Sequence, residues 1–284
     1  MKVYGIDVSH HQGRIDWPTV AAALRKVNGG TNPGFAILRV GYSSKSGKGG
    51  LVTDGEILNN LKGCTENGVP FGIYYYCYDQ SPEAAVTTTQ QVIQMIRGYK
   101  PEYPIFYDVE YEPYNTGEDD SGRSKAQVRQ DNTDMICAAL NTLEDAGYYA
   151  VVYCSRAFFT EYTNLDQLEA FDKWEAAYTA TDTDTVKNGI WQYSSKNPLG
   201  IPGFGDSLDC DVAYKDYPAI TKKPVLTDGG DGHGTSANPW HICSAWHCSG
   251  VRHFHFRPLD CWHSCDPAQS RPERSAAAGK KDGG

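Results

Sequence analysis

Segments typical of β-strands alternate with segments typical of α-helices through the first 224 residues of this 284-residue chain. The predicted strand 35–40 is apolar almost throughout, as strands are when both of their faces are buried. Helix ends can also be recognised, since Asp16 and Pro18 supply a cap and a first-turn proline, and Gly68 ends the helix predicted over 54–67. This alternation predicts a parallel sheet, and about eight strands over roughly 220 residues predict closure into a barrel. The expected fold class is therefore α/β, a TIM-like β/α barrel.

The remaining predicted elements complete the alternation. Strands are expected at 3–8, 71–78, 103–111, 150–155, 173–178 and 189–194, and helices at 81–98, 125–145 and 165–171. In barrels of this class the chemistry takes place at the C-terminal ends of the strands. Asp7, Asp108 and Glu110 all fall at such ends.

The strand 103–111 carries Asp108 and Glu110, two residues apart. Side chains at this spacing project from the same face of a strand, with Cα atoms roughly 6.6 Å apart at about 3.3 Å per residue. Two ionised carboxylates so close repel each other, so we expect the pKa of one to rise while that of the other stays low. One group could then donate a proton and the other stabilise positive charge, which is the pair that glycoside cleavage requires. A solvated strand end would also explain the two residues.

Composition narrows the possible partners. The chain has 26 Lys and Arg against 35 Asp and Glu, a net charge of -9, so it lacks the basic surface expected of a protein that binds nucleic acid. No stretch approaches the ~20 apolar residues of a membrane span. The first strand follows Met1-Lys2 directly, without a recognisable signal peptide. We expect neither a cofactor nor a membrane partner.

Five cysteines are scattered through the predicted barrel, several of them in apolar surroundings: Cys64, Cys77, Cys137, Cys154 and Cys210. Their odd number favours buried free thiols in a protein made in a reducing compartment. A catalytic cysteine is not expected, because the histidines of this part of the chain are confined to one adjacent pair near the N-terminus.

Several motifs together resemble those of glycoside hydrolase family 25 lysozymes. They are Gly5-Ile-Asp-Val-Ser-His-His-Gln-Gly13, Ile15-Asp-Trp17, Gly72-Ile-Tyr-Tyr-Tyr76, Tyr107-Asp-Val-Glu110, Trp191-Gln-Tyr193 and Leu208-Asp-Cys-Asp-Val212. The resemblance extends over residues 3–217, in the family's order. It implies an irregular β/α barrel that cleaves the bond from N-acetylmuramic acid to N-acetylglucosamine in bacterial peptidoglycan. One departure is visible, since the last motif of the family more often reads Asp-Leu-Asn and this chain has Asp209-Cys-Asp211.

Roles follow for the two central carboxyl groups. Glu110 is expected to be the general acid, which protonates the leaving glycosidic oxygen and needs a raised pKa. Asp108 is expected to stay ionised and to orient the 2-acetamido group of the substrate, whose carbonyl oxygen can attack the anomeric carbon. We favour this substrate-assisted route with net retention. Direct attack by Asp108, or inversion through a water held by Asp7 or Asp209, stays open.

Asp7 and Asp209 match the other two members of the family's acidic cluster. The first and last strands of a barrel are neighbours where it closes, so we expect these two residues side by side across the seam. They could take part in catalysis or only hold hydrogen bonds at the barrel mouth. Four carboxylates could bind a hard cation, but barrel glycosidases need none and the chain has no Asp loop with ligand spacing, so no metal is expected.

Aromatic side chains are candidates for the saccharide cleft, because their flat faces pack against the apolar faces of sugar rings. Tyr74 and Tyr76 share one face of their strand, Trp191 and Tyr193 share one face of theirs, and Tyr178 ends another. For each of them, packing in the core explains the residue as well. The adjacent histidines after the first strand are interpreted as cleft-edge or structural residues and not as a base.

Residues 221–284 differ in composition from the catalytic barrel predicted over 1–220. Beyond a linker rich in Gly and Asp at 227–234 the chain has several histidines, few aliphatic side chains and four cysteines. These are Cys243, Cys248, Cys261 and Cys265. They could staple a small wall-binding module through zinc or disulfides. Their irregular spacing favours instead a poorly structured tail or the remnant of a lost domain.

The expected function is that of an N-acetylmuramidase, and two alternatives are considered. A non-catalytic glycan-binding module could share the scaffold, although the presence of all four acidic residues argues against a decayed site. A chitinase also carries Asp-x-Glu on a barrel strand, but its motif has further Asp residues where this chain has Phe106 and Tyr103. The expected partner is peptidoglycan, met by a monomer that is released from the cytoplasm as phage endolysins are, or secreted by another route.

Overall fold

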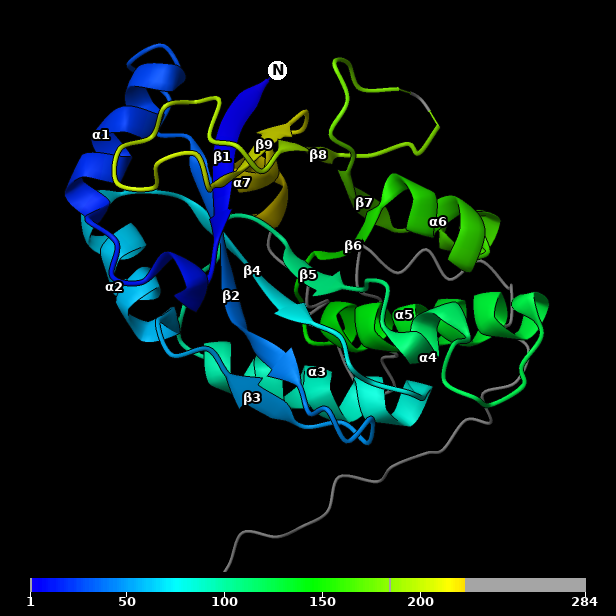
Figure 1. Ribbon diagram of the computed structural model, residues 1–284. Helices are drawn as coiled ribbons and strands as arrows, with labels where there is room; N and C mark the ends of the chain where they lie inside the picture. The colour runs from blue at the N-terminus through cyan, green and yellow to red at the C-terminus, as the bar shows by residue number, and fades with distance from the viewer. Residues whose placement is uncertain (1, 184, 223–284) are drawn as a thin grey trace, which may run out of the picture. The chain divides into compact units, whose positions relative to one another are not determined.

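The computed structural model describes residues 2–183 and 185–222, which are built around an eight-stranded barrel (Figure 1). The strand order around the ring is β1-β9-β8-β7-β6-β5-β4-β2, and β2 pairs with β1 to close it. The barrel strands are β1 (Val3–Val8), β2 (Phe35–Ser43), β4 (Phe71–Tyr76), β5 (Ile105–Asp108), β6 (Ala150–Ser155), β7 (Asp172–Ala176), β8 (Ile190–Ser194) and β9 (Asp209–Ala213). A short strand, β3 (Leu51–Thr53), pairs with the end of β2 outside the ring. The predicted α/β barrel is confirmed.

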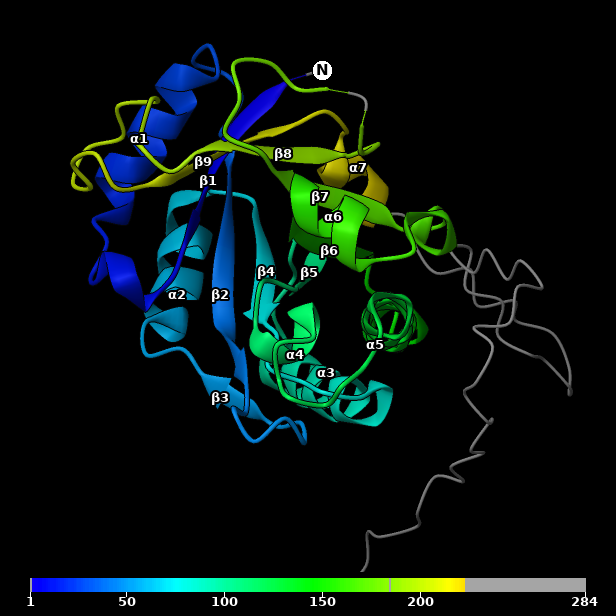
Figure 2. The ribbon, with the colours of Figure 1, turned by 45° about the vertical axis from the view of Figure 1, so that its right-hand side comes forward.

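Helices surround the barrel on its outer side (Figure 2). The α-helices are α1 (Trp17–Val27), α2 (Ile57–Asn67), α3 (Pro82–Ile96), α4 (Pro113–Thr116), α5 (Lys125–Asp145), α6 (Arg156–Tyr162) and α7 (Tyr217–Thr221), and the 3-10 helices are η1 (His10–Gln12) and η2 (Leu165–Leu168). Within the described ranges no helix is both long and apolar enough to cross a membrane. The predicted linker and the stretch rich in Cys and His lie outside the described residues.

One strand departs from the parallel arrangement that the sequence predicts. β9 runs antiparallel to both of its neighbours, β8 and β1, whereas the other pairings in the ring are parallel. A parallel pair needs a crossover connection, usually a helix, and no helix lies between β8 and β9 in the described chain. The chain therefore reverses its direction after β8, and β9 runs back beside it.

Alternate residues along the strands face two separate cores. Inside the barrel, Phe35, Phe106 and Trp174 belong to one buried cluster that fills its cross-section. On the outer side, alternate positions such as Leu38 and Val152 pack with the buried faces of the helices. The cysteines of the barrel all belong to this outer core, and those at 64, 77, 154 and 210 are free thiols, as predicted.

Several element boundaries differ from those predicted. The helix expected over 54–67 begins at Ile57, because Asp54 turns its carboxylate toward the barrel mouth instead of only capping the helix. The strand expected over 103–111 ends at Asp108, so Glu110 lies on irregular backbone. The sequence reading missed α6, which begins directly after β6 with Ser155 as its cap.

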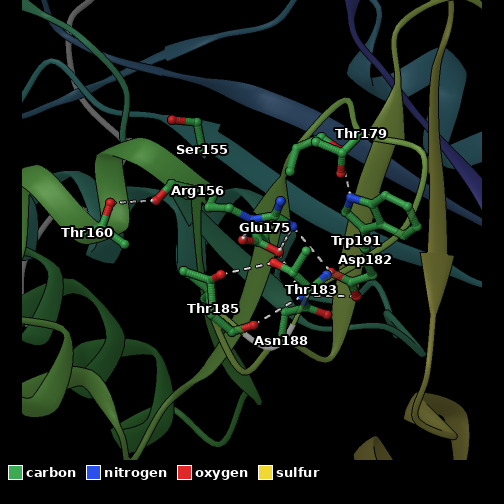
Figure 3. A network of polar contacts seen from close by, with 12 residues as sticks. Ser155, Arg156, Thr160, Glu175, Thr179, Asp182, Thr183, Thr185, Asn188 and Trp191 are labelled. Carbon is green, nitrogen blue, oxygen red and sulfur yellow. Dashed lines mark hydrogen bonds and ion pairs between the residues drawn. The ribbon is translucent and has the colours of Figure 1, made fainter.

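The loop between β7 and β8, residues 177–189, is tied to the start of α6 by a polar network (Figure 3). Arg156 donates to both carboxylate oxygens of Glu175 at 2.6 and 3.2 Å and to Asp182 of the loop at 3.4 Å. Asn188 donates to Glu175 at 2.9 Å and also reaches Asp182. Because the Glu175 side chain is fully buried, these donors stabilise a charge that water does not reach.

We predict that Arg156→Met lowers the free energy of unfolding by about 3 kcal/mol, because it leaves the Glu175 carboxylate buried without its cation. The double variant Arg156→Met/Glu175→Leu should recover most of this loss. Denaturant unfolding at neutral pH measures both. As a control, Lys62→Met breaks an ion pair between exposed side chains and should cost less than about 1 kcal/mol. Equal losses in the two single variants would contradict the prediction.

Candidate active site

Four carboxyl groups gather at one end of the barrel, which we call the mouth. Asp7 lies near the end of β1, Asp108 is the last residue of β5, and Glu110 follows two residues later. Asp209 begins β9, and since this strand is antiparallel its start lies at the same end of the barrel. Asp7 and Asp209 are paired directly across β1 and β9, so the expected neighbourhood at the seam is confirmed.

Asp108 and Glu110 both have raised pKa values. Burial raises the pKa of Asp108 well above its usual range and repulsion by Glu110 adds to this, while Arg39 acts in the opposite direction. Burial also raises the pKa of Glu110, together with the charges of Glu112 and Asp209. The prediction that the pKa of only one of the pair would rise is therefore wrong, because the fold removes both from water. Asp108 is the more deeply buried, and its Oδ1 has no hydrogen-bond partner among the described residues.

Arg39, on β2, brings a positive charge to the mouth. Its Nε donates to Asp54 at 2.8 Å, and Asp54 also accepts the backbone N–H groups of His10 and Glu56 at 3.1 and 2.9 Å. Burial acts to raise the pKa of Asp54, but these hydrogen bonds outweigh it and the pKa is lowered. Asp54 therefore holds the guanidinium in place, and the positive charge of Arg39 partly offsets the rise in the pKa of Asp108. Neither residue was predicted from the sequence, although an arginine within an apolar strand is a signal that could have pointed to Arg39.

The two histidines lie beside this ion pair. They form η1 directly after β1, and their rings lie 4.1 Å apart. The His10 ring hydrogen-bonds Asp54 at 3.0 Å and contacts the guanidinium of Arg39. Burial lowers the pKa of His11, and the charges of His10 and Arg39 add to this effect. This placement agrees with a structural role at the edge of the mouth.

Gln192 links the other side of the mouth. Its Oε1 accepts the hydroxyl groups of Tyr153 and Tyr178, both at 3.0 Å. This fixes the orientation of the amide, so that Nε2 donates to Oδ2 of Asp7 at 2.8 Å. Gln192 lies in the Trp191-Gln-Tyr193 motif, but no role was predicted for it. A polar residue between two aromatic residues on a predicted strand is the signal that it faces the barrel interior.

Three of the five predicted sugar-binding aromatic residues reach the mouth. Tyr74 packs edge-on against Trp174 inside the barrel, with ring centroids 6.0 Å apart. Tyr76 donates its hydroxyl to Glu112 at 2.7 Å. Tyr178 follows β7 and is 59% exposed, so its ring is open to a ligand. Their roles in binding stay a prediction.

Trp191 and Tyr193 are not brought to the mouth. They flank Gln192 on β8, and strand alternation turns them to the outer face of the barrel. The indole N–H of Trp191 donates to the carbonyl of Ala177 at 2.8 Å, which fixes the start of the loop after β7. Tyr193 packs against Trp191 and Tyr4, with centroids 5.6 and 6.4 Å away. The cleft position expected for these two residues is therefore corrected to a packing position.

An open depression of about 600 Å³ lies beside the mouth, at the ends of β5, β6 and β7. Its lining includes Tyr111, Ser155, Ala176 and Thr179. Tyr111 is 51% exposed, and its hydroxyl lies 2.9 Å from that of Ser155. An exposed ring flanked by hydroxyl groups suits the face and edge of a sugar.

The mouth can thus supply an acid that keeps its proton, a buried carboxyl group beside it, and aromatic walls. Such a set suits cleavage of a glycosidic bond, in which the leaving oxygen takes up a proton while the sugar develops positive charge. Over residues 2–183 and 185–222, no group of three or more His, Cys, Asp or Glu side chains is arranged to hold a metal ion.

Comparison with known proteins agrees with this geometry. The family model "Glycosyl hydrolases family 25" matches residues 6–201. The modular autolysin LytC from Streptococcus pneumoniae has a similar structure, with a TM-score of 0.59 and 28% sequence identity, over 75% of this chain and 47% of that one. This chain therefore spans about half the length of that autolysin. A family GH25 lysozyme from Aspergillus fumigatus shares the fold, with a TM-score of 0.56 and 20% identity over 78% of this chain and 98% of that one.

A curated sequence relative is the uncharacterized protein YegX of Escherichia coli O157:H7, which is 25% identical over 214 residues, 74% of this chain and 69% of its own length. Asp209 lies beyond the stretch that the family model matches. That stretch nevertheless runs from within β1 to beyond β8 and covers most of the chain. The protein therefore belongs to glycosyl hydrolases family 25 and is a glycoside hydrolase.

Proposed function

We propose that the protein is a lysozyme of the N-acetylmuramidase type, which hydrolyses the β-1,4 bond between N-acetylmuramic acid and N-acetylglucosamine in bacterial peptidoglycan. The observation that carries this proposal is the pair of Asp108 and Glu110 at the mouth, both with raised pKa values. Membership of the family supports it. So does the related autolysin LytC, which was solved in complex with a synthetic peptidoglycan ligand.

Glu110 is the general acid in this proposal. Burial and the charges of Glu112 and Asp209 keep its proton bound at pH values where an exposed glutamate has lost it. It is only partly buried and lies past the end of β5, so a leaving glycosidic oxygen at the mouth can approach it. Protonation of that oxygen turns a poor leaving group into a neutral alcohol.

Asp108 faces the positive charge that develops on the sugar. In the free protein its ionised form is disfavoured by burial and by Glu110, and the fixed guanidinium of Arg39 offsets this in part. Positive charge on the substrate supplies the missing partner, so the carboxylate of Asp108 is stabilised more in the transition state than in the ground state. The same carboxylate can accept the N–H of a 2-acetamido group and turn its carbonyl oxygen toward the anomeric carbon.

Asp7 and Asp209 form the opposite wall of the mouth. Their charges also act on the hydroxyl group of Tyr178, whose pKa they help to raise. We propose that they bind the saccharide and orient water for the second half of the reaction. All of these groups come from one chain, so a monomer suffices. The protein would meet its substrate in the cell wall after release, as endolysins do.

The first test is digestion of purified peptidoglycan by the protein, Glu110→Gln and Asp108→Asn, followed by borohydride reduction and mass spectrometry. The protein should release muropeptides that end in reduced N-acetylmuramic acid. Each variant should lose about 10²–10⁴-fold in rate, the range that one general acid or one electrostatic group supplies. As a matched control, Glu118→Gln changes an exposed carboxylate in the loop after α4 and should leave the rate unchanged.

Three results would contradict the proposal in different ways. Ends that carry reduced N-acetylglucosamine would show that another bond is cut. Full activity of Glu110→Gln would remove the assigned acid. Binding of the protein to cell walls without any cleavage would favour a glycan-binding module on this scaffold.

A second prediction concerns pH. The charge of Glu112 helps to hold the pKa of Glu110 above its usual value, so Glu112→Gln should lower the pKa of the acid. Because the acid must be protonated to act, activity on the alkaline side should be lost at a lower pH than in the unaltered protein. A profile of kcat against pH measures the shift. Glu118→Gln should leave the profile in place, and an upward shift in Glu112→Gln would contradict the assignment.

A third prediction separates the aromatic residues at the mouth from those behind it. Tyr178→Ala should raise KM for a soluble peptidoglycan fragment about three- to tenfold, since one aromatic contact is worth roughly 0.5–1.5 kcal/mol. Tyr193→Phe keeps the packing ring on the outer face and should not change KM. If the two variants behave alike in steady-state kinetics, Tyr178 has no part in binding.

A further inference from the structure

Asp211 is a buried carboxyl group to which the proposed mechanism gives no role. It lies on β9 two residues after Asp209, is 0% exposed, and faces the barrel interior. The indole N–H of Trp174 donates to its Oδ1 at 2.8 Å. No N–H or O–H group of the described residues donates to its Oδ2. An ionised carboxylate in this place would leave one oxygen without a donor, which is costly in a buried site.

The group that Asp211 meets across the seam is Asp7. The register of β1 and β9 places them diagonally, since Asp7 pairs with Asp209 and Gly5 pairs with Asp211. Each of the two carboxyl groups acts on the pKa of the other, and a hydrogen bond between them would give the unpartnered Oδ2 of Asp211 a partner. Two carboxyl groups can form such a bond only when one of them carries a proton, because two carboxylates have four acceptor oxygens and no donor.

The surroundings do not supply positive charge in place of that proton. In the part of the chain that the structure describes, no ion pair reaches Asp7 or Asp211. Two neutral N–H donors serve the pair, from Gln192 to Asp7 and from Trp174 to Asp211. The titratable groups that interact electrostatically with the pair are acidic or neutral: Asp209 and Cys210 on β9, Tyr74 on β4, Tyr153 on β6, Tyr178 after β7 and Tyr193 on β8.

We propose that Asp211 is a positioning residue for Asp7: the two carboxyl groups share one proton, which joins β1 to β9 at the mouth and keeps a second negative charge out of the seam. Gln192 and the shared proton then hold Asp7 from two sides. The side chain of Asp7 is fixed toward the mouth, next to Asp209. The effect on catalysis rests on the function proposed above, whereas the shared proton itself does not.

Electrostatics support the same arrangement. Burial, and to a smaller extent the charge of Asp209, raises the pKa of Asp211 to about 8. Burial and the charges of Asp211 and Asp209 raise the pKa of Asp7. Because the folded protein binds this proton more tightly than the unfolded chain, it contributes stability at low pH. That stability is lost as the pH rises from the ordinary aspartate range toward 8.

The decisive variant is Asp211→Asn, since an amide of the same shape donates an N–H to Asp7 without a proton that can be lost. The melting temperature of the unaltered protein should fall more steeply with pH, between about pH 5 and 8, than that of Asp211→Asn. Asp206→Asn, an exposed residue before β9, should follow the unaltered protein. Parallel curves for the unaltered protein and Asp211→Asn would overturn the proposal.

Infrared spectroscopy gives a second readout that does not depend on activity. At pH 6 the unaltered protein should show the carbonyl stretch of a protonated, buried carboxyl group, and Asp211→Asn should lose one such component. Trp174→Phe removes the N–H that lowers the pKa of Asp211, so this component should persist to higher pH. Loss of the component at unchanged pH in Trp174→Phe, or its full retention in Asp211→Asn, would contradict the shared proton.

Activity on peptidoglycan tests the positioning role. Asp211→Asn should stay active at pH 6, because its amide still donates a hydrogen bond to Asp7. Asp211→Leu, which offers no hydrogen bond to Asp7, should lose about ten- to a hundredfold in kcat. Equal activity of Asp211→Leu and Asp211→Asn would overturn the role. If the unaltered protein cleaves no peptidoglycan, the proposed function fails, while the melting and infrared results still decide the shared proton.

Discussion

The pairing of β1 with β9 is the contact on which the rest of the structure depends. It joins the first and the last strand of the ring, so without it the sheet would stay open and its interior would meet water. The same pairing places Asp7 opposite Asp209 and brings Asp211 beside them. The same strand pairing therefore closes the barrel and positions the acidic groups, whose mutual repulsion has to be offset by donors such as Gln192.

The two cores have different tasks. The outer core fixes the helices against the sheet with aliphatic side chains and thiols. The inner core is largely aromatic, and its upper end becomes polar where Arg39, Gln192 and the acids replace apolar residues. Because the aromatic layer beneath them excludes water, the acids lie at the boundary between a dry interior and the solvent. Their raised pKa values follow from this position.

Much of this could be predicted from the sequence, because it depends on local patterns. Strand and helix alternation gave the barrel, the ends of strands gave Asp7 and Asp108, and barrel closure gave the neighbourhood of Asp7 and Asp209. What could not be predicted depends on contacts between distant residues. Three features depend on how distant segments of the chain come together. They are the direction of β9, the ion pair of Asp54 with Arg39, and the outward orientation of the Trp191 side chain.

The antiparallel course of β9 also decides where the chain leaves the barrel. A final parallel strand would end at the mouth, whereas β9 ends at the opposite side, where Tyr217 of α7 donates to Asp172 at the start of β7 at 2.6 Å. Thr221 then donates to the carbonyl of Glu102, ahead of β5. A domain or tag fused after residue 222 would accordingly start from the end of the barrel opposite the mouth, away from the acidic groups.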